Sequence, residues 1–140
     1  MKFSRKANAQ WEGTGKEGKG NISTQSEVLD KTAYSFGTRF AEGKGTNPEE
    51  LIGAAHAGCF TMQLSFLLNE EGFTATDLST DAKVTFEDGE ITHITLELTG
   101  NVPDVSKEKF AEIANKAKEV CPISKLLKAG IKALKKAEKK

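Results

Sequence analysis

The chain is poor in several residue types that mark particular classes of protein. Only two of its 20 basic residues are arginine, it has two cysteines and three prolines, and its formal net charge is zero. A balanced charge argues against nucleic-acid binding, which relies on excess positive charge on one face. No secretory signal is visible, and no stretch approaches the ~20 apolar residues that span a bilayer. We therefore expect a cytoplasmic protein without membrane or nucleic-acid partners.

The length of the chain fits one domain. It has 140 residues, of which 37% are hydrophobic. A domain of this size buries roughly 68% of the surface that its unfolded chain exposes, so a dimer interface would help to stabilise it. We expect a single domain over 1–140, with a lysine-rich, frayed end over about 131–140.

The N-terminal third predicts strands, and a long helix follows it. The first 40 residues, Phe36–Phe40 included, are expected to be strands, with 13–20 as a hairpin tip. Asn47 is a good N-cap and Gly72 a good stop, which predicts a helix over Pro48–Glu71. Its middle, 51–68, has no charged residue, as in a helix buried on nearly every side.

The second half predicts a hairpin and two helices. Apolar residues alternate on both sides of Asp88-Gly89, a tight-turn signal, and Pro103 ends the hairpin. Ser106 is expected to cap a helix over 107–120, and a last helix is expected from Ile123 to about Lys136. Strands and helices mix without a βαβ rhythm, which indicates an α+β fold.

The two cysteines are the first candidates for chemistry. Cys59 lies in mid-helix, whereas Cys121 would be the N-cap of the last helix, where free amides favour a thiolate. The residues leave three readings open: inert core thiols, metal ligands or a redox pair. His56 and His93 would complete a zinc set, but the set lacks the closely spaced ligand pairs of structural zinc sites.

Arg39 and Glu49 are the charged candidates. Glu49 precedes Cys59 by ten residues on the predicted helix, ~15 Å along its axis, and is too far to touch the thiol. Arg39 could pair with Glu49 and direct its guanidinium toward Cys59. The alternatives are an ordinary surface arginine and an acid that complements the helix dipole.

Two sequence blocks resemble the OsmC branch of the OsmC/Ohr hydroperoxide reductases. The blocks are Thr38-Arg39-Phe40 with Gly45-Thr46-Asn47-Pro48-Glu49-Glu50-Leu51-Ile52-Gly53-Ala54-Ala55-His56-Ala57-Gly58-Cys59-Phe60, and Cys121-Pro122-Ile123-Ser124. The resemblance implies an antiparallel sheet wrapped around two main helices in an intertwined homodimer. One departure is the Lys-rich segment 130–136, where the family usually closes with an apolar strand.

The resemblance also implies an activity. Cys59 would be the peroxidatic residue, Cys121 the resolving one, and Arg39 and Glu49 would lie beside the reactive sulfur. The protein would reduce organic hydroperoxides, and hydrogen peroxide more weakly, without a cofactor or metal. An external dithiol, such as a lipoyl or thioredoxin-like partner, would reset it. A peroxide sensor or a non-catalytic binding protein with the same cysteine pair is the alternative.

Overall fold

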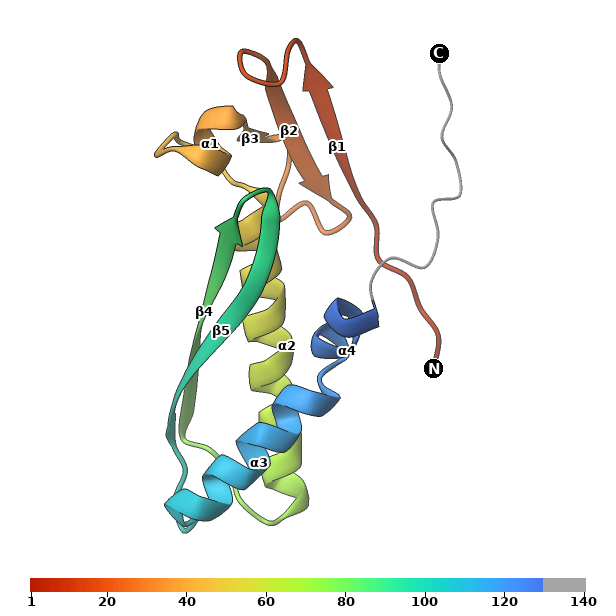
Figure 1. The fold of residues 1–140 in the computed structure, drawn as a ribbon. Coiled ribbons are helices and arrows are strands. Elements are labelled where there is room, and N and C mark those ends of the chain that lie inside the picture. The colour runs from red at the N-terminus through yellow and green to blue at the C-terminus, as the bar shows by residue number, and fades with distance from the viewer. Residues whose placement is uncertain (130–140) are drawn as a thin grey trace. The chain divides into compact units, whose positions relative to one another are not determined.

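The computed structural model describes residues 1–129 and divides into two compact units, Met1–Ile52 and Gly53–Lys140. Figure 1 shows the elements of each. The first unit holds a three-stranded antiparallel sheet, with the order β1 (Ala7–Glu12), β2 (Lys19–Thr24) and β3 (Thr32–Tyr34). The hairpin tip predicted over 13–20 lies between β1 and β2, although Lys19 and Gly20 already belong to β2. The predictions for the frayed end and for the last part of the final helix lie outside the described residues.

The first unit also contains a short helix that the sequence reading missed. Phe36–Phe40 forms α1 and not a strand. Its N-terminus is closed by a capping box, in which Ser35 Oγ accepts from the Thr38 amide at 3.3 Å and Thr38 Oγ1 accepts from the Ser35 amide at 2.8 Å. These two side chains satisfy amides that a helix start leaves unpaired, and this outweighs the strand preference of the aromatic residues.

The long helix α2 spans Pro48–Glu70, one residue shorter than predicted. Asn47 Oδ1 accepts from the Glu50 amide at 2.7 Å, and Gly72 follows the helix with a φ of +88°. Its buried residues lie on one face: Gly53, His56, Phe60, Leu64, Leu67 and Leu68. Met62 and Phe66 are 64% and 59% exposed, so within one chain the prediction of burial holds for one face only.

The sequence-based expectation about membrane-spanning segments needs a correction. Among residues 1–129, α2 is long and apolar enough to cross a membrane by length and composition. The central helix of a soluble protein passes the same test, because a helix that is apolar all round is also what a core requires. Phe60, Leu64 and Leu68 of α2 lie in the hydrophobic core of this protein.

The second unit packs a hairpin and two helices around the rest of α2. β4 (Asp77–Glu87) pairs antiparallel with β5 (Glu90–Asn101) through a turn in which Asp88 and Gly89 have φ values of 49° and 84°. Ser106 caps α3 (Lys107–Val120), and α4 follows over Pro122–Ala129. The predicted hairpin, the Ser106 cap and the α+β class are all confirmed.

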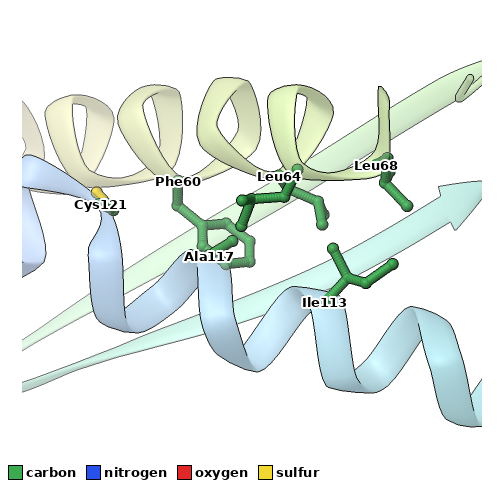
Figure 2. Packing of buried hydrophobic residues seen from close by; sticks show 7 residues of the cluster. Phe60, Leu64, Leu68, Ile113, Ala117 and Cys121 are labelled. Atoms are coloured by element: carbon green, nitrogen blue, oxygen red, sulfur yellow. The ribbon is translucent and has the colours of Figure 1, made fainter. Parts of the chain in front are cut away.

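Helices α2 and α3 meet in the hydrophobic core. Figure 2 shows Phe60, Leu64 and Leu68 of α2 facing Ile113 and Ala117 of α3. Leu64, Leu68 and Ala117 are fully buried, and so is Cys121, which ends α3 and lies in the same cluster. The core therefore continues directly into the cysteine that precedes α4.

We predict that Leu64→Ala lowers the free energy of unfolding by about 2–5 kcal/mol, because it leaves a cavity between α2 and α3. Chemical denaturation measures this change. Val28, which is 81% exposed, offers a control: Val28→Ala should stay within about 0.5 kcal/mol of the wild type. Equal effects of the two substitutions would contradict the core described here.

Candidate active site

The two cysteines lie together in the second unit. Cys59 projects from α2 and Cys121 from the junction of α3 and α4, and both are unbridged thiols. Their sulfur atoms are 2.8 Å apart and share a hydrogen bond, although 62 positions separate the residues in the chain. Cys59 is partly buried and Cys121 is fully buried. The fold therefore places the two thiols where they can react with each other.

Cys121 has the surroundings of a thiolate. Burial acts to raise the pKa of the Cys121 thiol, but hydrogen bonds from Cys59, from the Ser124 amide and hydroxyl and from the Ile123 amide outweigh it and bring the pKa below its ordinary value. The two amides belong to the first turn of α4, where backbone donors have no partner within the helix. These amides act in the direction that the N-cap position predicts.

For Cys59, the surroundings shift the pKa of the thiol in the opposite direction. Burial raises the pKa of the Cys59 thiol, and the hydrogen bond with Cys121 raises it further, against a smaller lowering by the Ile123 amide. Within this unit, Cys121 is therefore the thiol of the pair that ionises more readily, and Cys59 the one that keeps its proton longer. A positive charge close to the Cys59 sulfur would favour the thiolate, which is the form that attacks.

Arg39 and Glu49 form the predicted ion pair in the first unit. Arg39 Nη2 and Nε donate to Glu49 Oε1 at 2.6 and 3.1 Å. These hydrogen bonds raise the pKa of Arg39. Burial alone would raise the pKa of Glu49, but Arg39 lowers it below its ordinary value of 4.5. The pair is thus fully charged at neutral pH and loses stabilising energy only as the pH falls below that value.

The start of α2 fixes the place of this pair. Asn47 Nδ2 donates to the carbonyl of Thr38 at 3.1 Å and to Glu50 Oε1 at 3.0 Å. One side chain therefore ties the end of α1, where Arg39 lies, to the first turn of α2, where Glu49 lies. The guanidinium also lies over the Phe40 ring, 4.9 Å from its centroid. Arg39 is held on two sides.

An aromatic pocket adjoins Arg39 in the first unit. It has a volume of about 260 Å³ and is lined by Trp11, Gly15, Tyr34, Ser35, Phe36, Arg39 and Phe40. The rings of Trp11 and Tyr34 are 5.3 Å apart. Gly20 lets them close on β2, because a Cβ there would lie within 2.6 Å of both rings. Sequence reasoning did not single out Trp11 and Tyr34 as residues of a pocket.

The two histidines have different surroundings. His56 is buried, and its Nε2 lies 2.8 Å from Ser124 Oγ. Burial lowers the pKa of His56. His93 is exposed on β5, where its Nδ1 contacts Thr92. Within residues 1–129, no group of three or more His, Cys, Asp or Glu side chains could hold a metal ion.

Sequence reasoning did not single out Ser124 as a site residue, although it stands in the motif that contains Cys121. A serine three residues after an N-cap reads as an ordinary first-turn residue. Its contact with His56 joins positions 68 apart in the chain, which only the packing of α4 on α2 creates. The motif itself, in which Ser124 closes the cysteine block, was the available signal.

The comparisons with known proteins agree with this geometry. The model of the OsmC-like protein family matches residues 41–133. Peroxiredoxin OsmC of Escherichia coli (strain K12) is 49% identical over 135 residues, which cover 94% of each chain. The organic hydroperoxide resistance protein OhrB of Bacillus subtilis (strain 168) is 30% identical over 116 residues, which cover 80% of this chain and 84% of OhrB.

Solved structures of OsmC-like and Ohr proteins have the same fold as this chain. The crystal structure of Bacillus subtilis OhrB matches with a TM-score of 0.66 and 31% identity, covering 88% of this chain and 89% of that one. An OsmC-like protein from Vibrio cholerae shares the fold, with a TM-score of 0.67 at 14% identity over 89% of this chain and 93% of its own. Because the sequence blocks, the fold and the relatives agree, the chain belongs to the OsmC family, which includes the OsmC and Ohr proteins.

Proposed function

We propose that the protein is a thiol-dependent peroxidase that reduces organic hydroperoxides, and hydrogen peroxide more weakly, to alcohols or water. The observation that carries the proposal is the 2.8 Å contact between Cys59 and Cys121 in a member of the OsmC family. Two relatives are named for this chemistry, a peroxiredoxin and an organic hydroperoxide resistance protein. Cys59, Cys121, Arg39 and Glu49 are the proposed catalytic residues.

The first step oxidises Cys59. Its thiolate attacks the terminal oxygen of the hydroperoxide, the O–O bond breaks, and the alkoxide leaves and takes up a proton to become the alcohol. The product on Cys59 is a sulfenic acid. Cys59 suits this role better than Cys121 because it is partly exposed, whereas Cys121 is fully buried.

The second step closes the cysteine pair. The Cys121 sulfur attacks the Cys59 sulfur, an S–S bond forms, and the hydroxide that leaves is protonated to water. An external dithiol, in a lipoyl or thioredoxin-like partner, then reduces the disulfide by exchange. The contact between the two sulfur atoms is short enough for closure with only a small movement.

Arg39 is proposed to supply the positive charge that Cys59 lacks among its own neighbours. A guanidinium near this sulfur would favour the thiolate and stabilise the charge that develops on the leaving oxygen. Glu49 would hold Arg39 in place, as the hydrogen bonds at 2.6 and 3.1 Å between them indicate. Either subunit of a dimer could provide this pair.

The aromatic pocket supports a preference for organic substrates. Its walls are the rings of Trp11, Tyr34, Phe36 and Phe40, and Arg39 stands beside them. A pocket of about 260 Å³ could hold a benzyl or short alkyl group, and burying such a group would favour it over hydrogen peroxide.

We further propose that residues 1–140 form a single domain that works as an intertwined homodimer in the cytoplasm. The supporting observation is the exposed apolar face of α2, where Met62 and Phe66 are 64% and 59% exposed in the isolated chain. A partner subunit would remove this surface from water, as obligate dimers of small domains do.

We predict that the purified protein consumes many equivalents of cumene hydroperoxide when a dithiol is supplied, and that Cys59→Ser abolishes this turnover. Hydrogen peroxide should give a smaller second-order rate constant. A coupled assay of dithiol oxidation measures both. Turnover that persists in Cys59→Ser would show that Cys59 is not the peroxidatic residue. A wild type that consumes a single equivalent would indicate a sensor.

Cys121→Ser is expected to leave the first oxidation intact and to block recycling. Cys59 would then stay as a sulfenic acid and proceed to sulfinic acid when peroxide is in excess, because the resolving thiol is missing. Mass spectrometry of the intact chain after titration with peroxide detects the added oxygens. A Cys121→Ser variant that cycles as fast as the wild type with a dithiol would show that another thiol resolves Cys59.

Arg39→Lys should slow peroxide reduction by about 10²-fold despite keeping the positive charge, because lysine lacks the planar fork that Glu49 holds. Glu49→Gln should also slow it, and by less, since glutamine still accepts a hydrogen bond. Stopped-flow measurement of Cys59 oxidation gives both rates. The exposed Arg5 provides the matched control, because Arg5→Lys alters no proposed contact. Wild-type kinetics in Arg39→Lys would reduce Arg39 to a surface residue.

A further inference from the structure

A second contact lies beside the cysteine pair in the second unit. His56 is one turn before Cys59 on α2, and Ser124 is one turn after Cys121, at the start of α4. His56 Nε2 lies 2.8 Å from Ser124 Oγ, and the two sulfur atoms are also 2.8 Å apart. Residues one helical turn apart lie on the same side of a helix. Helix α2 therefore meets the segment 121–124 at two matched points, one between polar side chains and one between thiols.

The polar contact is buried. His56 and Ser124 are 7% and 8% exposed as whole residues. Among the buried side-chain nitrogens and oxygens of residues 1–129, only His56 Nδ1 has no hydrogen-bond partner. A buried N–H without a partner costs more than a buried lone pair, so the proton belongs on Nε2, which donates to Ser124 Oγ. The hydrogen bond to Ser124 is therefore what compensates for a polar ring at this buried position.

Little else holds α4 against α2 within the chain. Of residues 122–128, only Ser124 is buried. Ile123 packs against the hydrophobic core, whereas Leu126 is 57% exposed. Among the described residues, the bond between His56 and Ser124 is the only side-chain hydrogen bond that joins these two helices. The position of α4 on α2 therefore depends on this bond more than on apolar packing.

Cys121 is tied to both helices that flank it. Its amide donates to the Ala117 carbonyl of α3 at 3.0 Å, and its carbonyl accepts from the Lys125 amide of α4 at 3.1 Å. On the α3 side, Ala117 is fully buried in the core, and packing fixes its position. On the α4 side, the hydrogen bond between Ser124 and His56 fixes the helix. The placement of Cys121 therefore depends on core packing at one end and on this hydrogen bond at the other.

We propose that the hydrogen bond between His56 and Ser124 is a clamp that keeps Cys121 in register with Cys59 after Cys59 has been oxidised, and so sets the rate at which the disulfide closes. This inference rests on the proposed function and deepens it. His56 and Ser124 are positioning residues, because they act through the placement of Cys121.

The oxidised state shows why a separate clamp is needed. In the reduced pair, the two thiols share a hydrogen bond. A sulfenic oxygen on Cys59 alters this contact, whereas the clamp involves neither sulfur atom. The Cys121 sulfur then attacks the Cys59 sulfur, the S–S bond forms, the S–OH bond breaks, and the leaving hydroxide and the proton of Cys121 form water. Because the reaction joins two groups that are already held together, its rate follows how well the clamp holds them.

The first arm of the test needs no peroxide. The full chain is equilibrated with mixtures of reduced and oxidised dithiothreitol, and thiol labelling gives the fraction of disulfide. Ser124→Ala and His56→Leu should each make the disulfide about tenfold less stable, which raises its reduction potential by about 30 mV, because a loosened Cys121 is harder to bring to Cys59. Thr80→Val is the matched control and should leave the potential unchanged. It removes the 2.7 Å hydrogen bond from Thr61, which joins α2 to β4, and leaves the clamp intact.

The second arm measures the rate of closure. After one equivalent of cumene hydroperoxide, acid quenching and thiol labelling follow the disulfide. Ser124→Ala and His56→Leu should each close about tenfold more slowly, and with excess peroxide they should accumulate more sulfinic acid on Cys59. The first oxidation of Cys59, followed by stopped flow, should keep its wild-type rate, because the clamp acts only after it.

Two further variants distinguish the clamp from a general structural defect. The double variant Ser124→Ala with His56→Leu should close no more slowly than the slower single variant, because both changes break the same bond. His56→Gln should restore closure, since its amide nitrogen can replace Nε2 as the donor to Ser124 Oγ.

The outcomes separate this inference from the proposed function. An unchanged reduction potential and closure rate in both single variants would overturn the clamp, even if the wild type turns over peroxide. Additive effects in the double variant would also overturn it, because the two residues would then act independently. Slowing that disappears at high pH would do the same, since it would indicate an effect on the ionisation of a thiol and not on its position. A raised potential in both variants of a protein without peroxidase turnover would support the clamp and overturn the proposed function.

Discussion

The packing of α2 against α3 is the constraint on which the candidate site depends. Phe60, Leu64 and Leu68 of one helix close on Ile113 and Ala117 of the other, and the same cluster takes in Cys121. Cys59, next to Phe60 in the chain, is thereby brought to 2.8 Å from Cys121. A change in this packing would therefore change the distance between the two sulfur atoms.

The N-termini of α2 and α4 supply polar contacts to the candidate site residues. The first turn of α2 carries Glu49, which orders Arg39, and the first turn of α4 turns its amides toward Cys121. In both places the residue just before the helix lies at its N-terminal end and meets its first-turn amides: Asn47 before α2, and Cys121 before α4. Backbone donors that a helix start leaves unpaired thus find acceptors in the residue just before each helix.

Local signals in the sequence predicted most of the elements. Caps and the glycine stop placed α2 and α3 to within one residue at each end, and alternation around Asp88-Gly89 located the β4–β5 hairpin. The prediction failed at Phe36–Phe40, where the aromatic and basic side chains suggested a strand. The capping box formed by Ser35 and Thr38 was not recognised there. The pairing of Arg39 with Glu49 was within reach, since both lie close to the same helix start.

Long-range contacts explain what the sequence could not predict. The meeting of Cys59 with Cys121, and of His56 with Ser124, joins positions more than 60 apart and depends on how α3 and α4 lie on α2. The charge balance of the cysteines was also out of reach. An N-cap position predicted a favoured thiolate at Cys121, but the raised pKa of Cys59 needs its burial and its neighbour to be known.

The unequal exposure of the two sulfurs gives the catalytic cycle a direction. Cys121 is fully buried and Cys59 only partly so. If the disulfide keeps this placement, an incoming reductant meets the Cys59 sulfur, forms its mixed disulfide there, and releases Cys121 as the leaving group. A thiol with a lowered pKa leaves more readily. The helix end that steadies Cys121 during closure would then also ease reopening, so one electrostatic feature serves both halves of the cycle.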